Sequence, residues 1–182
     1  MTIYFITGNE NKFKEANEIL NTDLEQIDID LTEIQELDAK AVIRAKLLEA
    51  CKLTNKSSFI IEDTSLYFEG LNNMPGPLIK WFLKSVGNEG LYKMAQTFNN
   101  FNAAATTYIG YLSGNDIQFF KGEIKGTIVE PQGENGFGWD KIFVPVGFDK
   151  TFAQMTDDEK NSLSMRKLAF EELKKELEKQ KN

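Results

Sequence analysis

Two groups of carboxylates have the residue types that hydrolytic chemistry needs. Glu62 and Asp63 directly follow an apolar run, and Glu33 and Glu36 lie in an earlier acidic stretch. Mg²⁺ prefers oxygen ligands and commonly takes one or two protein carboxylates together with substrate phosphates. Asp63 could therefore supply one ligand and Glu33 another. The same side chains could also be solvated surface carboxylates, because the chain contains 28 Asp and Glu among its 182 residues.

Thr7-Gly8-Asn9, followed by Lys12, has features of a phosphate-binding loop. These residues lie between a short apolar run and a helical pattern. The amino end of a helix attracts anions because its first backbone N–H groups are unpaired and its dipole is positive there, and Lys12 adds a charge. The spacing is not that of a Walker A loop, because there is one glycine and no Gly-Lys-Ser/Thr ending. An ordinary polar loop with a surface lysine is the competing interpretation.

A third group combines aromatic and charged residues. Phe137-Gly138-Trp139-Asp140 lies in a glycine-rich stretch, and Lys160 and Arg166 follow in a helical pattern. An aromatic face beside a carboxylate suits a purine, through stacking and hydrogen bonds to the edge of the base. The aromatic rings could instead belong to the core, and the two cations to a solvated helix face.

The elements that must position these groups are readable from the hydrophobic pattern. Residues 2–6 form a β-branched and aromatic run, after which apolar residues take helical spacing up to Leu20. Residues 24–31 indicate a second strand, and Asp38 is placed to cap the helix that follows. The apolar run 59–61 is typical of a strand buried on both faces, which puts Glu62 and Asp63 at its carboxyl end.

The second half of the chain predicts a turn, two helices and an antiparallel meander. Pro75-Gly76-Pro77 marks the turn, and helices are expected over residues 78–86 and 88–98. The meander is expected over residues 106–112, 117–120 and 123–129. A capping box at Thr156 then opens one long helix, with an apolar stripe at Leu163, Phe170, Leu173 and Leu177. The expected fold is α/β, with a mixed sheet flanked by helices.

Length and composition limit the function classes. A chain of 182 residues fits one domain over residues 1–182. The net charge of −7 argues against a nucleic-acid polymer or an anionic membrane as partner, and no apolar run is long enough to span a bilayer. The single cysteine, Cys51, favours a cytoplasmic location. Because the chain has no histidine, catalytic triads and His-based metal sites are excluded, and a carboxylate is the sensible proton acceptor.

Taken in order, the motifs resemble the inosine triphosphate pyrophosphatase family, also called the Ham1-like family. The resemblance covers nearly the whole chain. It implies an elongated α/β fold with a mixed central sheet and two lobes around a nucleotide cleft, usually as a homodimer. It also implies Mg²⁺-dependent hydrolysis, with Mn²⁺ as a substitute, of ITP, dITP or XTP to the nucleoside monophosphate and pyrophosphate. The motifs that carry it are Thr7-Gly8-Asn9 with Lys12 and Glu15, Ile60 to Leu66, Met74-Pro75-Gly76-Pro77 followed by Ile79 to Leu83, Phe137 to Asp140, and Lys160-Asn161 through Arg166.

The resemblance also implies a role for individual residues. Asp63 would be the catalytic carboxylate, which binds the metal and activates water, and Glu33 would be a second metal ligand. The implied triphosphate ligands are Thr7, Gly8, Asn9, Lys12 and Lys46. The implied positions lining the substrate are Glu62, Thr64 and Lys80. The implied base and sugar positions are Phe137, Gly138, Trp139, Asp140, Lys160, Met165 and Arg166.

One position departs from the family pattern. The family reads Ser-His-Arg where this chain reads Ser164-Met165-Arg166, and that histidine helps to donate a hydrogen bond to the 6-oxo group of the base. Methionine cannot donate this bond, so weaker discrimination against adenine is expected, resting on Arg166 and backbone N–H groups.

Three other functions remain open from the sequence. The chain could be a nucleotide-binding module that has lost catalysis, for which Met165 is the argument. It could be a related pyrophosphatase of the Maf type with other base selectivity. It could also be a structural protein whose acidic surface binds partners.

Overall fold

The computed structural model describes residues 2–180 as a mixed α/β fold. The strands are β1 (Ile3–Ile6), β2 (Leu24–Ile27), β3 (Ser58–Phe68), β4 (Met74–Gly76), β5 (Asn102–Ser113), β6 (Asp116–Ile128) and β7 (Phe143–Pro145). The α-helices are α1 (Glu10–Leu20), α2 (Ala39–Leu53), α3 (Ile79–Thr97), α4 (Asp157–Leu163) and α5 (Met165–Lys179). Short 3₁₀ turns are η1 (Glu69–Leu71), η2 (Asp140–Ile142) and η3 (Phe152–Gln154).

The seven strands form one sheet in the order β2-β1-β3-β5-β6-β7, with β4 paired to β3. Strand β1 is parallel to both β2 and β3, whereas β3 pairs with β4, and β6 with β7, in antiparallel fashion. The sheet is therefore mixed, as the sequence predicts. No helix within residues 2–180 is long and apolar enough to cross a membrane.

The chain divides into two compact units, each made from separate stretches of sequence. Unit 1 contains residues 2–63, 107–122 and 166–180, and unit 2 contains residues 64–106 and 123–165. Strands β3, β5 and β6 are each divided between the two units, with one segment in unit 1 and the other in unit 2. The single domain expected over residues 1–182 stays a prediction.

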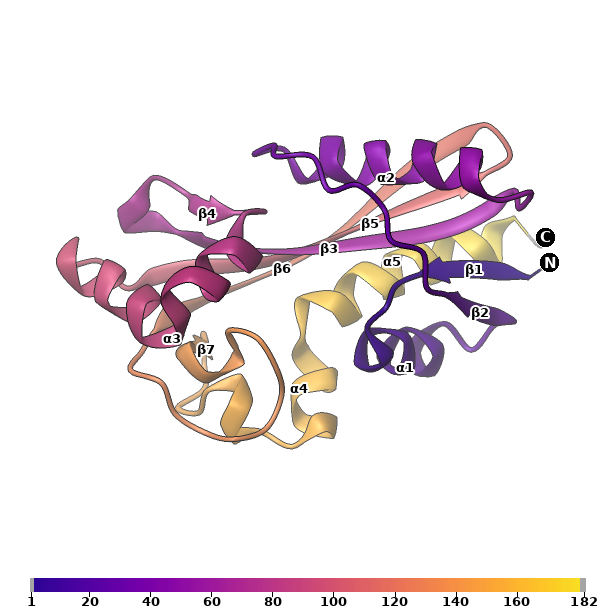
Figure 1. The fold of residues 1–182 in the computed structure, drawn as a ribbon. Helices are drawn as coiled ribbons and strands as arrows, with labels where there is room; N and C mark the ends of the chain where they lie inside the picture. Colours follow the sequence, from indigo (N-terminus) through magenta and orange to yellow (C-terminus); the bar gives the residue numbers. More distant parts are fainter. Residues whose placement is uncertain (1, 181–182) are drawn as a thin grey trace. The chain divides into compact units, whose positions relative to one another are not determined.

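Unit 1 has three layers, because its strands bury both faces. Along β1, Ile3 and Phe5 pack with residues of α1 and α5, whereas Ile6 packs with residues of α2. Along β3, Ile60 faces the α1 and α5 side, and Ile61 faces the α2 side. This alternation follows from the two-residue period of a strand. Figure 1 shows α2 over one face of these strands, with α1 and α5 over the other.

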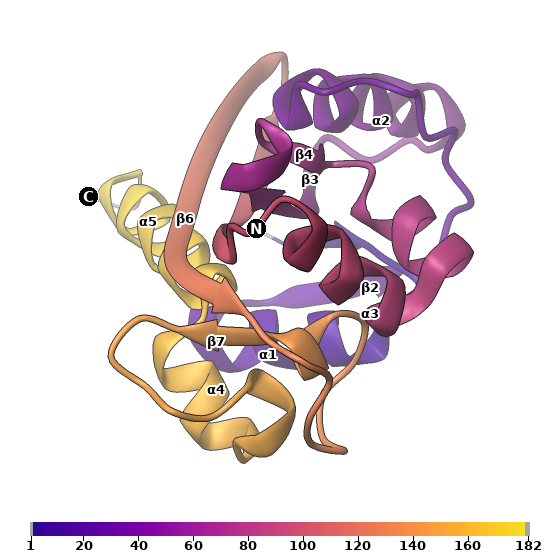
Figure 2. The same ribbon diagram turned by 90° about the vertical axis from the view of Figure 1, so that its left-hand side faces the viewer.

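Unit 2 has a separate core that is rich in aromatic rings. Trp139, Phe143 and Phe152 form a cluster in which ring centroids lie 5.4–6.3 Å apart. Residues of β3 and of helix α3 complete this core. Figure 2 shows β7 beside the end of β6, in agreement with the pairing of Ile128 with Phe143.

Several predicted elements are confirmed with adjusted bounds. Asp38 caps α2, and Thr156 forms the expected capping box with Glu159. The two helices expected over residues 78–86 and 88–98 form α3, which is kinked at Gly87 (φ 67°). Glycine tolerates this left-handed φ because it has no Cβ.

Four expectations are wrong in detail. The strand expected to end at Glu62 and Asp63 continues to Phe68 as β3, so the two carboxylates lie within the strand rather than at its carboxyl end. The last helix is not continuous, because Ser164 adopts an extended conformation (φ −68°, ψ 152°) that separates α4 from α5. The second and third strands of the meander are one strand, β6, which runs straight through Gly122. Strand β2 ends at Ile27, and Ile29 and Leu31 instead lie in a segment without regular structure, where they pack against the α2 side of unit 1.

Candidate active site

The loop between β1 and α1 is held by its own side chains. The Asn9 side chain accepts hydrogen bonds from the backbone N–H groups of Asn11 (3.0 Å) and Lys12 (3.2 Å) and so caps α1. Thr7 Oγ1 accepts from Asn9 N at 3.1 Å. The N–H groups of Asn11 and Lys12 are therefore satisfied by Asn9, so an anion that binds these two groups would have to replace that cap. The chain turns from β1 into α1 at this point because Asn9, which has an extended backbone, caps the helix with its side chain.

Gly8 matters because of its neighbour rather than its backbone angles. A Cβ at this position would lie 2.8 Å from Asp28 Oδ1. Asp28 follows β2, which pairs in parallel with β1, so the two loops emerge at the same edge of the sheet. The predicted phosphate loop therefore has a carboxylate beside it, and a cation is needed before it can hold a polyanion.

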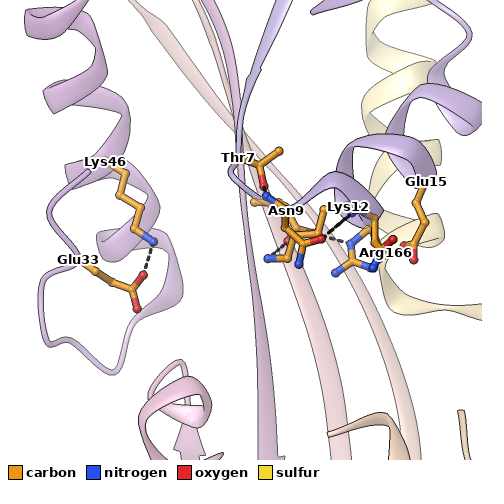
Figure 3. Close-up of polar contacts among 9 residues, drawn as sticks. Thr7, Asn9, Lys12, Glu15, Glu33, Lys46 and Arg166 are labelled. Carbon is orange, nitrogen blue, oxygen red and sulfur yellow. Dashed lines mark hydrogen bonds and ion pairs between the residues drawn. The ribbon is translucent and has the colours of Figure 1, made fainter. Parts of the chain in front are cut away.

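Glu62 is the centre of a buried ionic cluster on the α1 and α5 side of unit 1. Its two carboxylate oxygens contact Lys12 Nζ at 2.5 Å and Arg166 Nε at 2.8 Å. Arg166 Nη1 also contacts Glu15 at 2.5 Å. Arg166 is 1% exposed and Glu62 is 7% exposed, so two carboxylates are required to compensate the guanidinium away from water. Figure 3 shows the labelled members of this cluster gathered around Lys12.

The cluster controls the protonation of its members. Burial alone would raise the pKa of Glu62, but Arg166 and Lys12 outweigh burial and lower this pKa from 4.5 to about 2. Burial alone would lower the pKa of Arg166, but Glu62 and Glu15 outweigh it and raise this pKa. Both groups are therefore charged at every physiological pH.

Asp63 faces the opposite side of the strand, where Lys46 and Glu33 lie. Lys46 Nζ contacts Glu33 Oε2 at 2.7 Å, and both residues act electrostatically on Asp63. Figure 3 shows the Lys46–Glu33 pair on the other side of the strands from Lys12 and Arg166. The alternation of β3 explains this separation, because Glu62 continues the face of Ile60 and Asp63 continues the face of Ile61.

The pKa of Asp63 is raised from its ordinary value of 3.8. Burial is the largest cause, Lys46 and Lys12 oppose it, and the negative charges of Glu62 and Glu33 add to it. A carboxylate with a raised pKa is a better proton acceptor than an ordinary one, which is the property that a general base requires.

The carboxylates of unit 1 suit a hard cation such as Mg²⁺ in their chemistry. Glu33 and Asp63 offer oxygen donors on one side of the strand. Across residues 2–180, no group of three or more His, Cys, Asp or Glu gathers closely enough to hold a metal by itself. A divalent ion here would therefore take one or two protein carboxylates, and phosphates or water would complete its shell.

The predicted base-binding residues of unit 2 form a second polar network around the buried pair Asp140 and Lys160. Asp140 Oδ2 accepts hydrogen bonds from Phe137 N and Lys160 Nζ, both at 2.8 Å. The Lys160 ammonium lies 4.5 Å from the centroid of the Phe137 ring. The Gly138 carbonyl accepts a hydrogen bond from Asn88 Nδ2 at 3.1 Å. The loop is thus fixed by polar contacts from two helices, α3 and α4.

The other predicted site residues of unit 2 differ in burial. Trp139 (8% exposed) and Met165 (2% exposed) belong to the core of that unit. Thr64 follows Asp63 in β3 and is half-buried. Lys80 is exposed on α3, with its ammonium 5.5 Å from the centroid of the Trp81 ring.

The structure thus unites the predicted residues in three groups. The first group contains Thr7, Gly8, Asn9, Lys12, Glu62 and Arg166. The second group contains Glu33, Lys46 and Asp63. The third group contains Phe137, Gly138, Asp140 and Lys160. Glu15 and Asn88 were given no role from the sequence. A signal existed for Glu15, since it lies one helical turn after Lys12 and beside the buried Ala16. Asn88 carries no comparable signal.

Comparisons with known proteins place the whole chain among similar sequences. The model of the Ham1 family matches residues 3–176. An inosine triphosphate pyrophosphatase from Schizosaccharomyces pombe is 42% identical over 185 residues, which cover 100% of this chain and 97% of the relative.

Two solved structures have the same fold. A HAM1 protein from Coxiella burnetii superimposes with a TM-score of 0.87 at 24% identity, over 98% of this chain and 99% of that chain. A nucleoside-triphosphatase (dITP/XTP pyrophosphatase) from Mycobacterium abscessus superimposes with a TM-score of 0.75 at 26% identity, over 95% and 98% respectively.

Proposed function

Because the chain belongs to the Ham1 family, we propose that it hydrolyses the non-canonical purine nucleoside triphosphates ITP, dITP and XTP to the nucleoside monophosphate and pyrophosphate. The names of the S. pombe and M. abscessus relatives support this substrate class. The observation that carries the proposal is the setting of Asp63, a carboxylate with a raised pKa beside a second carboxylate and a lysine.

Asp63 acts as the proton acceptor for the attacking water. With no histidine in the chain, a carboxylate whose pKa is raised by burial is the best general base available. Lys46 keeps Asp63 from losing its charge entirely, because its ammonium opposes the effect of burial. The water attacks the α-phosphorus, and pyrophosphate leaves.

We propose Glu33 and Asp63 as the residues that hold Mg²⁺, for which Mn²⁺ can substitute. Both offer the oxygen ligands that this ion prefers. The ion would neutralise phosphate charge and acidify a bound water. Lys12 and Lys46 supply further positive charge for the triphosphate, together with the loop formed by Thr7, Gly8 and Asn9.

For the base and sugar we propose the residues of the Phe137 loop. Phe137 presents an aromatic ring, and the Lys160 ammonium and Asp140 carboxylate hold that ring and the loop backbone in place. Arg166 is proposed to hold Glu62 in position, since its guanidinium is already bound by the carboxylates of Glu62 and Glu15. The remaining proposed contacts come from Thr64, Lys80, Gly138, Trp139 and Met165.

A substrate panel tests the proposed function. Pyrophosphate release is measured for ITP, dITP, XTP, GTP, ATP and the pyrimidine triphosphates, with Mg²⁺, with Mn²⁺ and with EDTA. We expect release from ITP, dITP and XTP to be fastest and to stop in EDTA. Preference for pyrimidine substrates would favour a Maf-type enzyme, and tight ITP binding without release would favour a binding module.

We further propose that the protein is a cytoplasmic homodimer. The single exposed cysteine, Cys51, supports a reducing compartment. Sedimentation at several protein concentrations tests the dimer, and localisation of a tagged chain in the source cell tests the compartment. A strictly monomeric species at micromolar concentration would contradict the proposed homodimer.

A further inference from the structure

Glu33 lies in a segment that has no regular structure to hold it. Residues 28–38, between β2 and α2, form neither helix nor strand. Ile29 and Leu31 pack partly against the α2 side of unit 1 and fix the start of the segment. They do not determine the direction of the next side chains, because an extended chain can still rotate about its contacts. A carboxylate that must meet a metal needs tighter placement than this.

Glu49, on helix α2, accepts two hydrogen bonds from Thr32, the residue before Glu33. Its Oε2 accepts from the backbone N–H of Thr32 at 2.9 Å, and its Oε1 accepts from Thr32 Oγ1 at 3.0 Å. Both oxygens of one carboxylate are therefore used on one residue. Two bonds fix the position and the rotation of Thr32, which one bond could not do.

Lys46 holds Glu33 itself, from the same helix. Its Nζ lies 2.7 Å from Glu33 Oε2. Lys46 and Glu49 are three residues apart on α2, so their side chains project from neighbouring turns of one helix face. Consecutive residues of the segment are thus held by neighbouring side chains of a rigid element.

We propose that Glu49 is a positioning residue, which acts through Thr32 to set the direction of Glu33 toward the metal. This inference rests on the proposed function, because Glu33 is a metal ligand only there. Glu49 does not contact the metal. It lowers the cost of metal binding because Glu33 is already oriented when the ion arrives, and outer partners of metal ligands typically change metal affinity by tenfold or more.

The chain offers a matched set of variants to test this clamp, by which we mean the two hydrogen bonds from Thr32 to Glu49. Thr32→Val removes the hydroxyl donor at nearly constant shape, whereas Thr32→Ser keeps both donors. Glu49→Gln retains one acceptor oxygen and presents an N–H₂ group to the other donor. Glu18→Gln, at an exposed position on α1, makes the same chemical change away from the segment. Thermal melting confirms that each variant is folded.

Two measurements are made on every variant. The first is the Mg²⁺ concentration that half-saturates pyrophosphate release, with kcat at saturating Mg²⁺. The second is Mn²⁺ binding to the resting protein, followed by water-proton relaxation, which requires no turnover. For Glu49→Gln we expect both constants to weaken about tenfold with kcat within twofold of wild type. Thr32→Val should show a smaller change in the same direction, and Thr32→Ser and Glu18→Gln should show none.

The outcomes separate this inference from the proposed function. Unchanged metal constants in both Glu49→Gln and Thr32→Val would overturn the clamp, even in a fully active enzyme. A wild type that releases no pyrophosphate but binds Mn²⁺, more weakly in Glu49→Gln, would overturn the proposed function and leave the clamp standing. A wild type that shows neither activity nor Mn²⁺ binding would overturn both.

Discussion

Glu62 and Asp63 are consecutive in the sequence and lie in opposite electrostatic environments. The pKa of Glu62 is lowered to about 2, because Arg166 and Lys12 outweigh the effect of its burial. The pKa of Asp63 is raised, because burial and two neighbouring carboxylates outweigh the effect of two lysines. The strand alternation alone sends the two side chains to different sides, where different helices supply the partners.

This difference divides two tasks between two residues. Glu62 is a permanent anion that holds cations in place, and it cannot serve as a proton acceptor near neutral pH. Asp63 has a raised pKa and therefore a carboxylate that gains a proton more easily. Pairs of carboxylates whose pKa values are driven apart are typical of sites where one residue transfers a proton and the other provides a fixed charge.

The largest expected effect comes from Asp63→Asn. Loss of the proton acceptor should lower kcat for ITP by a thousandfold or more, about 4 kcal/mol of barrier. The change is measured by pyrophosphate release under saturating Mg²⁺. Turnover like that of the wild type would remove Asp63 from the chemistry.

The same variant has an opposite effect on stability. Since the folded pKa of Asp63 is raised, its contribution to stability is complete below its ordinary value of 3.8 and is lost as the pH rises through the raised value. At pH 7 the ionised carboxylate is therefore a net cost to the fold. Asp63→Asn should have a melting temperature at pH 7 equal to or above that of the wild type, and a clear decrease would contradict the raised pKa.

Glu62→Gln should reverse this pattern of effects. The folded pKa of Glu62 is lowered from 4.5 to about 2, so its contribution to stability is present above pH 4.5 and is lost as the pH falls to about 2. This shift corresponds to about 3 kcal/mol at neutral pH. Denaturant unfolding at pH 7 should show a loss of this size, and the difference between variant and wild type should disappear near pH 2.

The sequence predicted those parts of the fold that depend on local chemistry. The cap at Asp38, the capping box at Thr156 and the break at Gly87 are all set by residues within one turn of each other. The apolar run before Glu62 predicted the strand but not its end, because β3 continues past Asp63 to Phe68 with polar residues in its middle. The break at Ser164 was missed because the residues on either side keep a helical pattern.

The partners of the charged residues could not be predicted, because they are distant in the sequence. Arg166 meets Glu62 and Glu15 across 104 and 151 residues. Such pairs depend on which helices pack on which face of a strand, and charge pattern alone does not determine that. Trp139 and Met165 illustrate the same limit, since the motif alone does not show that an aromatic or apolar residue near a ligand site is also part of a core, as both residues are in unit 2.

Met165→His extends the comparison from proton transfer to base selectivity. The resemblance to the family implies a donor to the 6-oxo group at this position, and methionine offers none. An imidazole should raise the ratio of ITP to ATP turnover by about tenfold, because a donor is left unpaired by the amine of adenine. Kinetics with ITP, XTP, GTP and ATP measure the ratio. Met165→Leu is the control, and unchanged ratios in Met165→His would show that selectivity arises elsewhere.

Asn88→Asp gives the smallest expected effect and tests how far the Phe137 loop of unit 2 depends on a neutral hydrogen bond in addition to the buried Lys160–Asp140 ion pair. Asn88 Nδ2 donates to the Gly138 carbonyl, and Asn88 Oδ1 is buried without a hydrogen-bond partner. Aspartate has the same shape but no donor, so it should release the Phe137 loop at a cost of about 1 kcal/mol. We expect KM for ITP to rise about fivefold with kcat nearly unchanged. The matched variant Gln96→Glu, exposed on the same helix, should leave KM unchanged. A fall in kcat at constant KM would instead link this loop to the chemical step and would contradict its proposed role in substrate binding alone.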